Sequence, residues 1–203
     1  MTTDNITIRN GVITHLNGVD IEHDENRYSL LKGANFEGLA LTNVDFTSFN
    51  LNGANFKNAH LYRVNFTKAS LAKVDMSGAR LDSIEFEGSN LEYIDLTKAT
   101  LRMVFFSTCF LYGAKFKNTD MSRANLGGQD FSGVDLINCD LEGAYLVKTN
   151  FEGSNLTGTN FNNANLKNAN LINADMTECK LANANLDGAV TDGVILESVR
   201  LSP

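Results

Sequence analysis

Three histidines and three cysteines are the side chains of this 203-residue chain best suited to catalysis or metal binding. They are His15, His23 and His60, and Cys109, Cys139 and Cys179. The histidines are scattered, and no spacing among them places a general base beside a nucleophile. The cysteines lack the short paired spacings of zinc sites and disulfide frameworks. The sequence therefore predicts no catalytic residue, no metal site and no cofactor, and we expect that the protein is not an enzyme.

The charge balance limits the partners that the chain can bind. There are 17 Lys and Arg residues against 24 Asp and Glu residues, which gives a formal net charge of −7. This acidity argues against direct nucleic-acid binding and against binding to an anionic membrane. No apolar run approaches the roughly 18 residues of a membrane helix, and the first ten residues lack an apolar signal core. We expect a cytoplasmic protein.

A period of five residues sets where the side chains point. Every fifth residue from Leu31 to Leu201 is Leu, Phe or Met, except Thr191. Two positions before each lies a second series, from Ala34 to Val199, in which small residues dominate. The residue between the two is Asn or Asp in 20 of 34 cases. Larger side chains interrupt the small series at Leu39, Phe49 and Gln129.

This period fits neither an α-helix nor a straight strand, since each would scatter the large residues over its surface. A chain that turns a corner every five residues directs both series inward. Phe46, Phe66 and Phe86 recur every 20 residues, so a four-sided coil stacks like on like. At 20 residues per coil, residues 31–201 make eight to nine coils of a solenoid, or roughly 40 Å of rod at about 4.8 Å per coil.

The repeated unit Ala-(Asn/Asp)-Leu-x-x resembles that of the pentapeptide-repeat family. Residues 164–168 and 169–173 are two clear copies, and the resemblance covers about residues 31–201. It implies an all-β fold, a right-handed quadrilateral parallel β-helix. The members of this family have many different roles, so the resemblance implies a fold more strongly than a function.

The two ends of the chain differ from the repeat. Asn10-Gly11 lies between β-rich segments and predicts a hairpin that caps the first coil. An acidic insert, residues 22–28, follows. We therefore divide the chain into an N-terminal cap, residues 1–30, and a β-helix, residues 31–203. The repeat continues almost to Pro203, so the open end of the solenoid is a candidate surface for a homodimer.

One segment in the middle of the repeat is aromatic where other coils are polar. Phe105 and Phe110 occupy the outward position that Asn or Asp usually fills, and Tyr93 is expected one coil before Tyr112 and beside it. Exposed aromatic residues with arginine are typical of interface hot spots. The candidate partner-binding surface is Tyr93, Arg102, Met103, Phe105, Phe110 and Tyr112.

We name the four faces of the expected coil after inward residues: the Leu61, Phe66, Leu71 and Phe56 faces. Their net charges are +2, −1, −2 and −3, respectively. Five of the seven arginines fall on the Leu61 face. The candidate basic face is Arg63, Arg80 and Arg123.

These features favour a scaffold that presents rigid faces to a protein partner whose identity the sequence does not give. The resemblance implies an alternative, because some pentapeptide-repeat proteins mimic DNA and act on DNA gyrase. Here the acidity is spread over three faces and interrupted by lysines, as at Lys115 between Asp95 and Asp135. A third possibility, ice binding, requires a threonine array, which begins at Thr47 and Thr67 and ends at Glu87.

Overall fold

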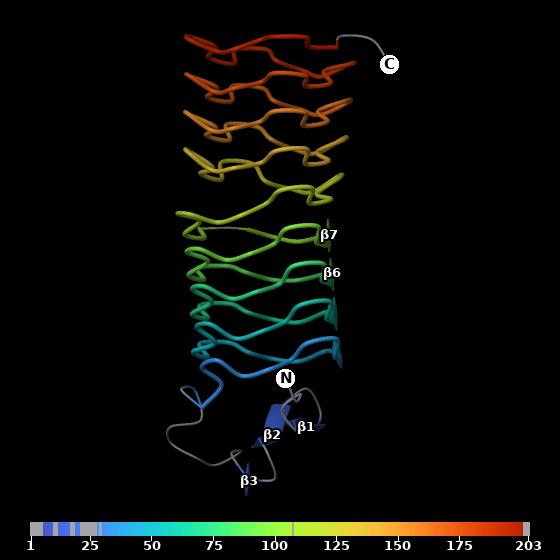
Figure 1. The fold of residues 1–203 in the computed structure, drawn as a ribbon, viewed down its shortest axis with the longest axis vertical. Coiled ribbons are helices and arrows are strands. Elements are labelled where there is room, and N and C mark those ends of the chain that lie inside the picture. Colours follow the sequence, from blue (N-terminus) through green and yellow to red (C-terminus); the bar gives the residue numbers. More distant parts are fainter. Residues whose placement is uncertain are drawn as a thin grey trace.

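The structure is a computed structural model that describes residues 6–9, 12–16, 19–20, 28, 30–106 and 108–200. Its first sheet is antiparallel and has the order β1 (Ile6–Arg9), β2 (Val12–Leu16) and β3 (Val19–Asp20). Its second sheet is parallel and has the order β4 (Ala40–Thr42), β5 (His60–Tyr62), β6 (Arg80–Asp82) and β7 (Thr100–Arg102). The remaining coils stack above β7 in the same direction (Figure 1).

The expected hairpin is present, because β1 and β2 pair antiparallel. Ile8 of β1 is partly buried and packs against the hydrophobic core of the solenoid. Asn10-Gly11 and residues 22–27 of the acidic insert lie outside the described residues. The ring of Tyr28 packs edge-on against Phe49, with the centroids 5.0 Å apart. The division between residues 30 and 31 stays a prediction.

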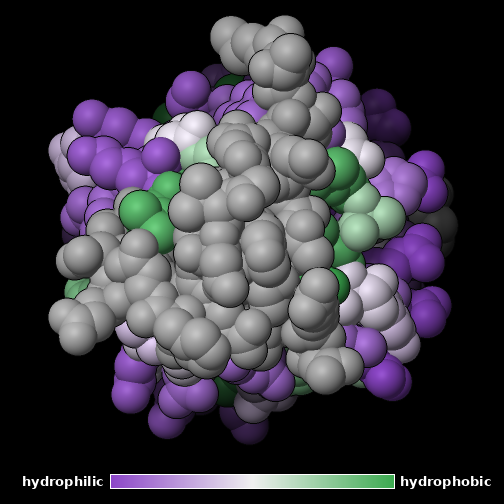
Figure 2. Space-filling view, turned by 90° about the horizontal axis from the view of Figure 1, so that it is seen from below, coloured by the Kyte–Doolittle hydropathy of each residue, from purple (hydrophilic) through white to green (hydrophobic). Residues whose placement is uncertain are grey.

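The right-handed four-sided coil is confirmed. Each described coil pairs in parallel with the next at a separation of 20 residues, from Asn35 with Asn55 to Lys180 with Arg200. The phenylalanine columns stack as the period predicts. The rings of Phe46 and Phe66 are stacked and nearly parallel, with their centroids 5.1 Å apart and an interplanar angle of 1°. Hydrophilic side chains surround much of the rim in the view from the β1–β3 end (Figure 2).

The corner residues have a backbone requirement that the sequence analysis did not identify. The residue two positions after each large residue has a positive φ at all 34 places between residues 33 and 198. The turn is closed by a hydrogen bond three residues on, as from the amide of Ala59 to the carbonyl of Phe56, at 2.9 Å. Gly and Asn tolerate this conformation best and fill 21 of the 34 places.

The small inward residues also contribute hydrogen bonds. Thr149 and Thr159 are fully buried, and each donates its hydroxyl to the backbone carbonyl of the residue 23 positions earlier, at 2.8 Å. The thiol of Cys139 does the same to Phe116, at 2.7 Å. Burial raises the pKa of Cys139 and of Cys179 to about 12. Polar atoms at these positions are therefore satisfied in the core.

The large residues are buried along the rod, and some of them become exposed at the last described turn. Leu186 is 37% exposed and Leu196 is 58% exposed. The reason is that no described coil lies above them to cover their side chains. A cavity of about 500 Å³ opens there, between Leu171, Leu186 and Val199.

Candidate functional site

One junction between successive coils lacks most of its hydrogen-bond ladder. In the neighbouring coils the amide of Leu91 donates to the carbonyl of Phe110, at 2.9 Å, and that of Phe131 to Asn150, at 2.7 Å. Within the described residues, the corresponding bonds from Phe106 and Leu111 to the next coil are not formed. We call this junction, between residues 103–114 and 122–135, the open seam. Figure 1 shows a wider step directly above the coil of β7, whereas the coils on either side of it are evenly spaced.

The upper side of the open seam has the same defect. Among the described residues, the amides of Asn125, Asp130 and Asp135 make no hydrogen bond of normal geometry to the backbone of the coil below. The junction stays closed on the Leu61 face, where the amide of Leu101 donates to Asp120 at 2.7 Å. The parallel pairing of Phe105 with Asn125 and of Lys115 with Asp135 is retained, whereas that of Phe110 with Asp130 is absent among the described residues. The open seam therefore extends over the Phe66 and Leu71 faces, and the break in pairing lies on the Leu71 face.

The side chain of Gln129 accounts for one of the missing backbone hydrogen bonds at the open seam. It occupies the small inward position, is 6% exposed, and its Nε2 donates to the carbonyl of Cys109 at 3.3 Å. In a regular coil this carbonyl would accept the backbone amide of Asp130, just as Gln129 itself accepts from Asn150 at 2.9 Å. The large side chain thus takes the place of a ladder bond. The sequence analysis noted Gln129 as an exception without assigning it a role.

The predicted outward direction of the aromatic segment is confirmed. Met103, Phe110 and Tyr112 are 66%, 63% and 72% exposed, and Tyr93, Arg102 and Phe105 are also exposed. Tyr93 lies beside Tyr112, as expected, with the rings edge-on at 5.5 Å. Desolvation and the neighbouring Tyr112 raise the pKa of the Tyr93 phenol. The candidate surface therefore lies along the open seam and continues to the Leu61 face through Arg102.

Two exposed tyrosine rings rest on glycines of an adjacent coil. A Cβ atom at Gly113 would lie 2.5 Å from Cδ1 of Tyr93. A Cβ atom at Gly127 would lie 2.6 Å from Cε1 of Tyr145, which is 48% exposed. Tyr145 was not among the predicted site residues, although it occupies a position usually filled by Asn or Asp. A glycine about one coil away was the signal that could have identified it.

Among the described residues, one cavity lies beside the open seam and two lie along it. The first, of about 460 Å³, lies on the Leu61 face and is lined by Arg102, Met103, Ser122, Arg123, Asp140 and Glu142. The second, of about 300 Å³, lies on the Phe66 face, and its lining includes Phe105, Asn125, Gly127 and Gln129. The third, of about 210 Å³, lies on the Leu71 face, and its lining includes Glu92, Phe110, Tyr112 and Asp130. The same junction thus supplies both exposed aromatic residues and concave surface.

The three arginines of the candidate basic face are exposed but do not form one patch. Arg63 lies over the ring of Tyr62, with its Cζ 5.0 Å from the centroid. Arg80 pairs in register with Thr100, in a column that continues to Asp120. Only Arg123 shares a cavity with another arginine, Arg102.

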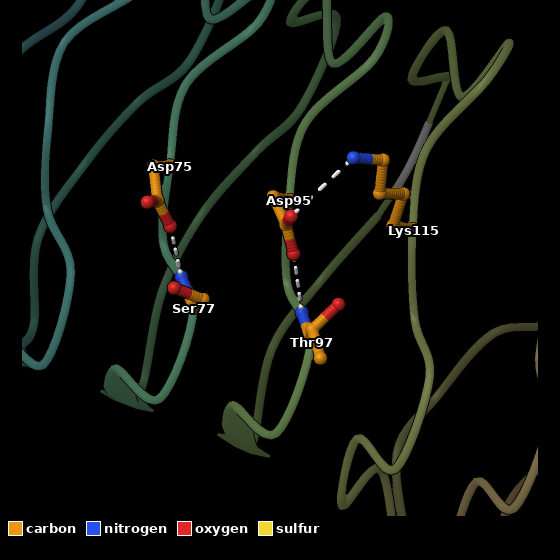
Figure 3. A network of polar contacts seen from close by, with 5 residues as sticks. All are labelled: Asp75, Ser77, Asp95, Thr97 and Lys115. Carbon is orange, nitrogen blue, oxygen red and sulfur yellow. Dashed lines mark hydrogen bonds and ion pairs between the residues drawn. The ribbon is translucent and has the colours of Figure 1, made fainter.

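The acidic column of the Phe56 face is interrupted by a lysine. Asp75, Asp95, Lys115 and Asp135 follow one another in register. Lys115 lies 3.6 Å from Asp95, whose carboxylate also accepts the amide of Thr97 (Figure 3). Burial alone would raise the pKa of Asp95, but the hydrogen bonds from Thr97 and the charge of Lys115 outweigh it, so the pKa is lowered.

Two further findings bear on chemistry. The described residues contain no group of three or more His, Cys, Asp or Glu side chains that could hold a metal ion. In the same part of the chain, no helix is long and apolar enough to cross a membrane.

Comparison with known proteins gives both a family and a fold. The sequence pattern of Pentapeptide repeats matches in eight copies over residues 89–197, and that of a Pentapeptide repeat region matches residues 29–96. No protein of curated function matches the sequence.

Solved structures with the same architecture include QnrB1, a plasmid-mediated fluoroquinolone resistance protein (the trypsin-treated M102R form). It is 19% identical, with a TM-score of 0.53, over 84% of this chain and 87% of the other. HetL, involved in heterocyst differentiation regulation in the cyanobacterium Nostoc sp. strain PCC 7120, is 24% identical, with a TM-score of 0.40. The match covers 84% of this chain and 86% of the HetL chain.

Proposed function

This chain belongs to the pentapeptide repeat family, and on that premise we propose that it is a non-enzymatic scaffold that binds a protein partner at the open seam. The observation that carries the proposal is the coincidence of exposed large apolar side chains with a broken ladder. Met103, Phe105, Phe110 and Tyr112 all lie at this one junction. Aromatic, methionine and arginine side chains are enriched in protein interfaces, and burying them on binding removes apolar area from water.

We also propose a cellular compartment and a second partner, and the residues that support these proposals are not those of the candidate surface. We propose a reducing compartment such as the cytoplasm, because Cys139 and Cys179 are buried thiols that form no disulfide. We also propose that a second copy of the chain covers Leu186 and Leu196 at the last described coil. Leu196→Glu would then weaken a dimer in analytical ultracentrifugation, whereas Glu197→Gln at the next position would not.

The scaffold proposal is tested by crosslinking at single positions in cells. A photoreactive phenylalanine analogue at Phe110 should crosslink to a defined partner, and the same analogue at Tyr62 should not. Tyr62 is a matched control because it is also exposed but lies on the Leu61 face, away from the open seam. The combined change of Phe110 and Tyr112 to Ser should abolish capture of that partner.

The same variant must remain folded for the result to count. We expect its free energy of unfolding to stay within about 1 kcal/mol of the native value, because both side chains are mostly exposed. Equal crosslinking from both positions, or capture that survives the double change, would contradict the proposal. A large loss of stability would show that the two rings are packed in the structure and are not a free surface.

The alternative is that the protein mimics DNA and acts on DNA gyrase. Its support is the net charge of −7 and a fold shared with QnrB1. The ion pair of Lys115 with Asp95 counts against DNA mimicry, because Lys115 neutralises a carboxylate in the acidic column of the Phe56 face. A gyrase supercoiling assay with and without a quinolone separates the two functions. Protection or inhibition at micromolar protein would favour mimicry, and no effect would favour the scaffold.

A further inference from the structure

We propose that the cavity on the Leu71 face takes a basic side chain, arginine or lysine, from an extended segment of the protein partner; this inference rests on the proposed function. The cavity lies on the open seam and has a volume of about 210 Å³. Two aromatic rings and two carboxylates contribute to its lining, namely Phe110, Tyr112, Glu92 and Asp130.

The coil geometry arranges these four side chains as a small grid. Phe110 follows Asn90 in one outward column, and Asp130 is the next residue of that column. In the neighbouring column, two residues further along the chain in each coil, Glu92 is followed by Tyr112 and then by Ser132. The two rings thus occupy the middle coil, with one carboxylate in the coil below and one in the coil above. Tyr93, edge-on to Tyr112, extends the aromatic surface.

The two carboxylates are not neutralised by the protein itself. The only ion pair among the described residues joins Lys115 to Asp95, on another face. Asp130 accepts the amide of Ser132 and the Nδ2 of Asn150 through a single oxygen, Oδ1, each at 3.0 Å. Among the described residues, the carboxylate of Glu92 accepts one long bond, 3.5 Å, from Nδ2 of Asn90. No described residue that lines the cavity is basic.

A cation is the ligand group that satisfies both parts of this lining. Lysine and arginine are attracted to the faces of aromatic rings and to carboxylates, and their aliphatic stems pack on apolar surface. The cavity of the Leu61 face is different, because Arg102 and Arg123 line it together with Asp140 and Glu142. The charge along the seam is therefore asymmetric, and the Leu71 end is the one that selects a basic residue.

Two synthetic peptides test the inference directly with the full chain. The first is acetyl-Leu-Ser-Leu-Arg-Leu-Ser-Leu-amide, and the second replaces arginine by citrulline, which has nearly the same shape and no charge. In a titration of ¹⁵N-labelled protein, we expect the arginine peptide to shift the amide signals of Leu111, Tyr112 and Asp130. Its affinity should be about three- to tenfold higher than that of the citrulline peptide.

The carboxylates are tested by substitution. The double variant Glu92→Gln, Asp130→Asn should lose the preference for arginine while retaining the fold. Glu152→Gln is the matched control, since Glu152 occupies the position of Glu92 three coils further on. In both residues the backbone amide donates to Oδ1 of the Asn two residues before it. This control should leave the preference unchanged.

The outcomes separate this inference from the proposed function. Equal affinity for the two peptides, with both still binding at Phe110, would overturn the selection of a basic side chain and leave the open seam as the interface. No signal change at these amides up to millimolar peptide would also overturn the inference. The proposed scaffold function would then be tested by the crosslinking experiment alone. A third peptide with glutamate in place of arginine is the charge-reversal control, and its tighter binding would overturn the inference and indicate Arg102 and Arg123 as the selecting groups.

Discussion

The corner residue of each repeat connects backbone conformation to the candidate surface. At Gly113 φ is 66°, and the ring of Tyr93 lies directly against the position that a Cβ would fill. At Gly133, one coil further on the same face, φ is 65° and nothing lies within 4 Å of that position. The two glycines therefore share one backbone requirement, and only Gly113 also supports a tyrosine ring.

Gly113→Ala is expected to be more destabilising than Gly133→Ala. Both changes impose a left-handed conformation on alanine, which costs roughly 1–2 kcal/mol. Gly113→Ala must in addition displace the ring of Tyr93 from its contact with Tyr112. Urea unfolding of both variants measures the difference, and equal losses would show that the ring moves freely.

The buried thiols are expected to react slowly and in a defined order. Burial raises the pKa of Cys139 and of Cys179 to about 12 and that of Cys109 to about 11, so at pH 8 all three remain protonated and poorly nucleophilic. Because these values exceed the ordinary thiol value, the cysteines favour the folded state at neutral pH, and this contribution decreases as the pH rises above about 9.

Cys109 should be alkylated first by iodoacetamide at pH 8, since it is 8% exposed and lines a seam cavity. Mass spectrometry of digests over time gives the order. Faster modification of Cys139 or Cys179 in the native protein would contradict their burial.

Between neighbouring coils, the ladder decides which elements are rigid. A regular coil is joined to the next through backbone bonds on every face, and at the open seam those of the Phe66 and Leu71 faces are largely missing. Gln129 fills part of the gap with a single side-chain bond. Segments with few ladder bonds open more easily than the rest of a fold.

Amide hydrogen exchange should reveal the seam. The amides of Leu111 and Asp130 are expected to exchange at least about tenfold faster than those of Leu91 and Asn150, which occupy the same positions in adjacent coils and are bonded.

Gln129→Ala should slow the exchange of Asp130, because an alanine-sized residue lets its amide reach the carbonyl of Cys109. Uniform protection along the rod, or no change in this variant, would contradict this role of Gln129.

For the molecule as a whole, stability is a sum over coils that contact only their neighbours. Phe66, Phe86 and Phe106 stack below the seam at ring distances of 5.4 and 5.3 Å. Above it a second aromatic column begins, with Phe131 and Phe151 at 5.7 Å. Phe116 joins the two columns edge-on, at 6.3 Å from Phe106 and 5.6 Å from Phe131. Because the backbone ladder is weakened there, we predict that the rod unfolds as two blocks that meet at the seam.

Phe86→Ala is expected to destabilise the lower block by about 3–5 kcal/mol, since the side chain is fully buried. The loss of exchange protection should extend through residues 31–101 and stop at the seam. Protection at Leu156 and Leu166 should persist. An equal loss along the entire rod would show that the seam transmits stability as well as any other junction.

Much of this architecture follows from the sequence for a local reason. The period of five fixes which side chains turn inward, and the period of 20 fixes the number of sides. Since each coil contacts only the next, no distant segment can override the pattern. The outward direction of Phe105, Phe110 and Tyr112 followed from the same rule.

The open seam and its cavities were decided by the tertiary structure. Whether Gln129 replaces a ladder bond depends on its fit against Cys109, 20 residues earlier and one coil below. Glu92 and Asp130 meet around one cavity only because two coils separate them along the rod and the junction between is open. A periodic pattern specifies the average coil, whereas a break in the ladder depends on how particular side chains pack across it.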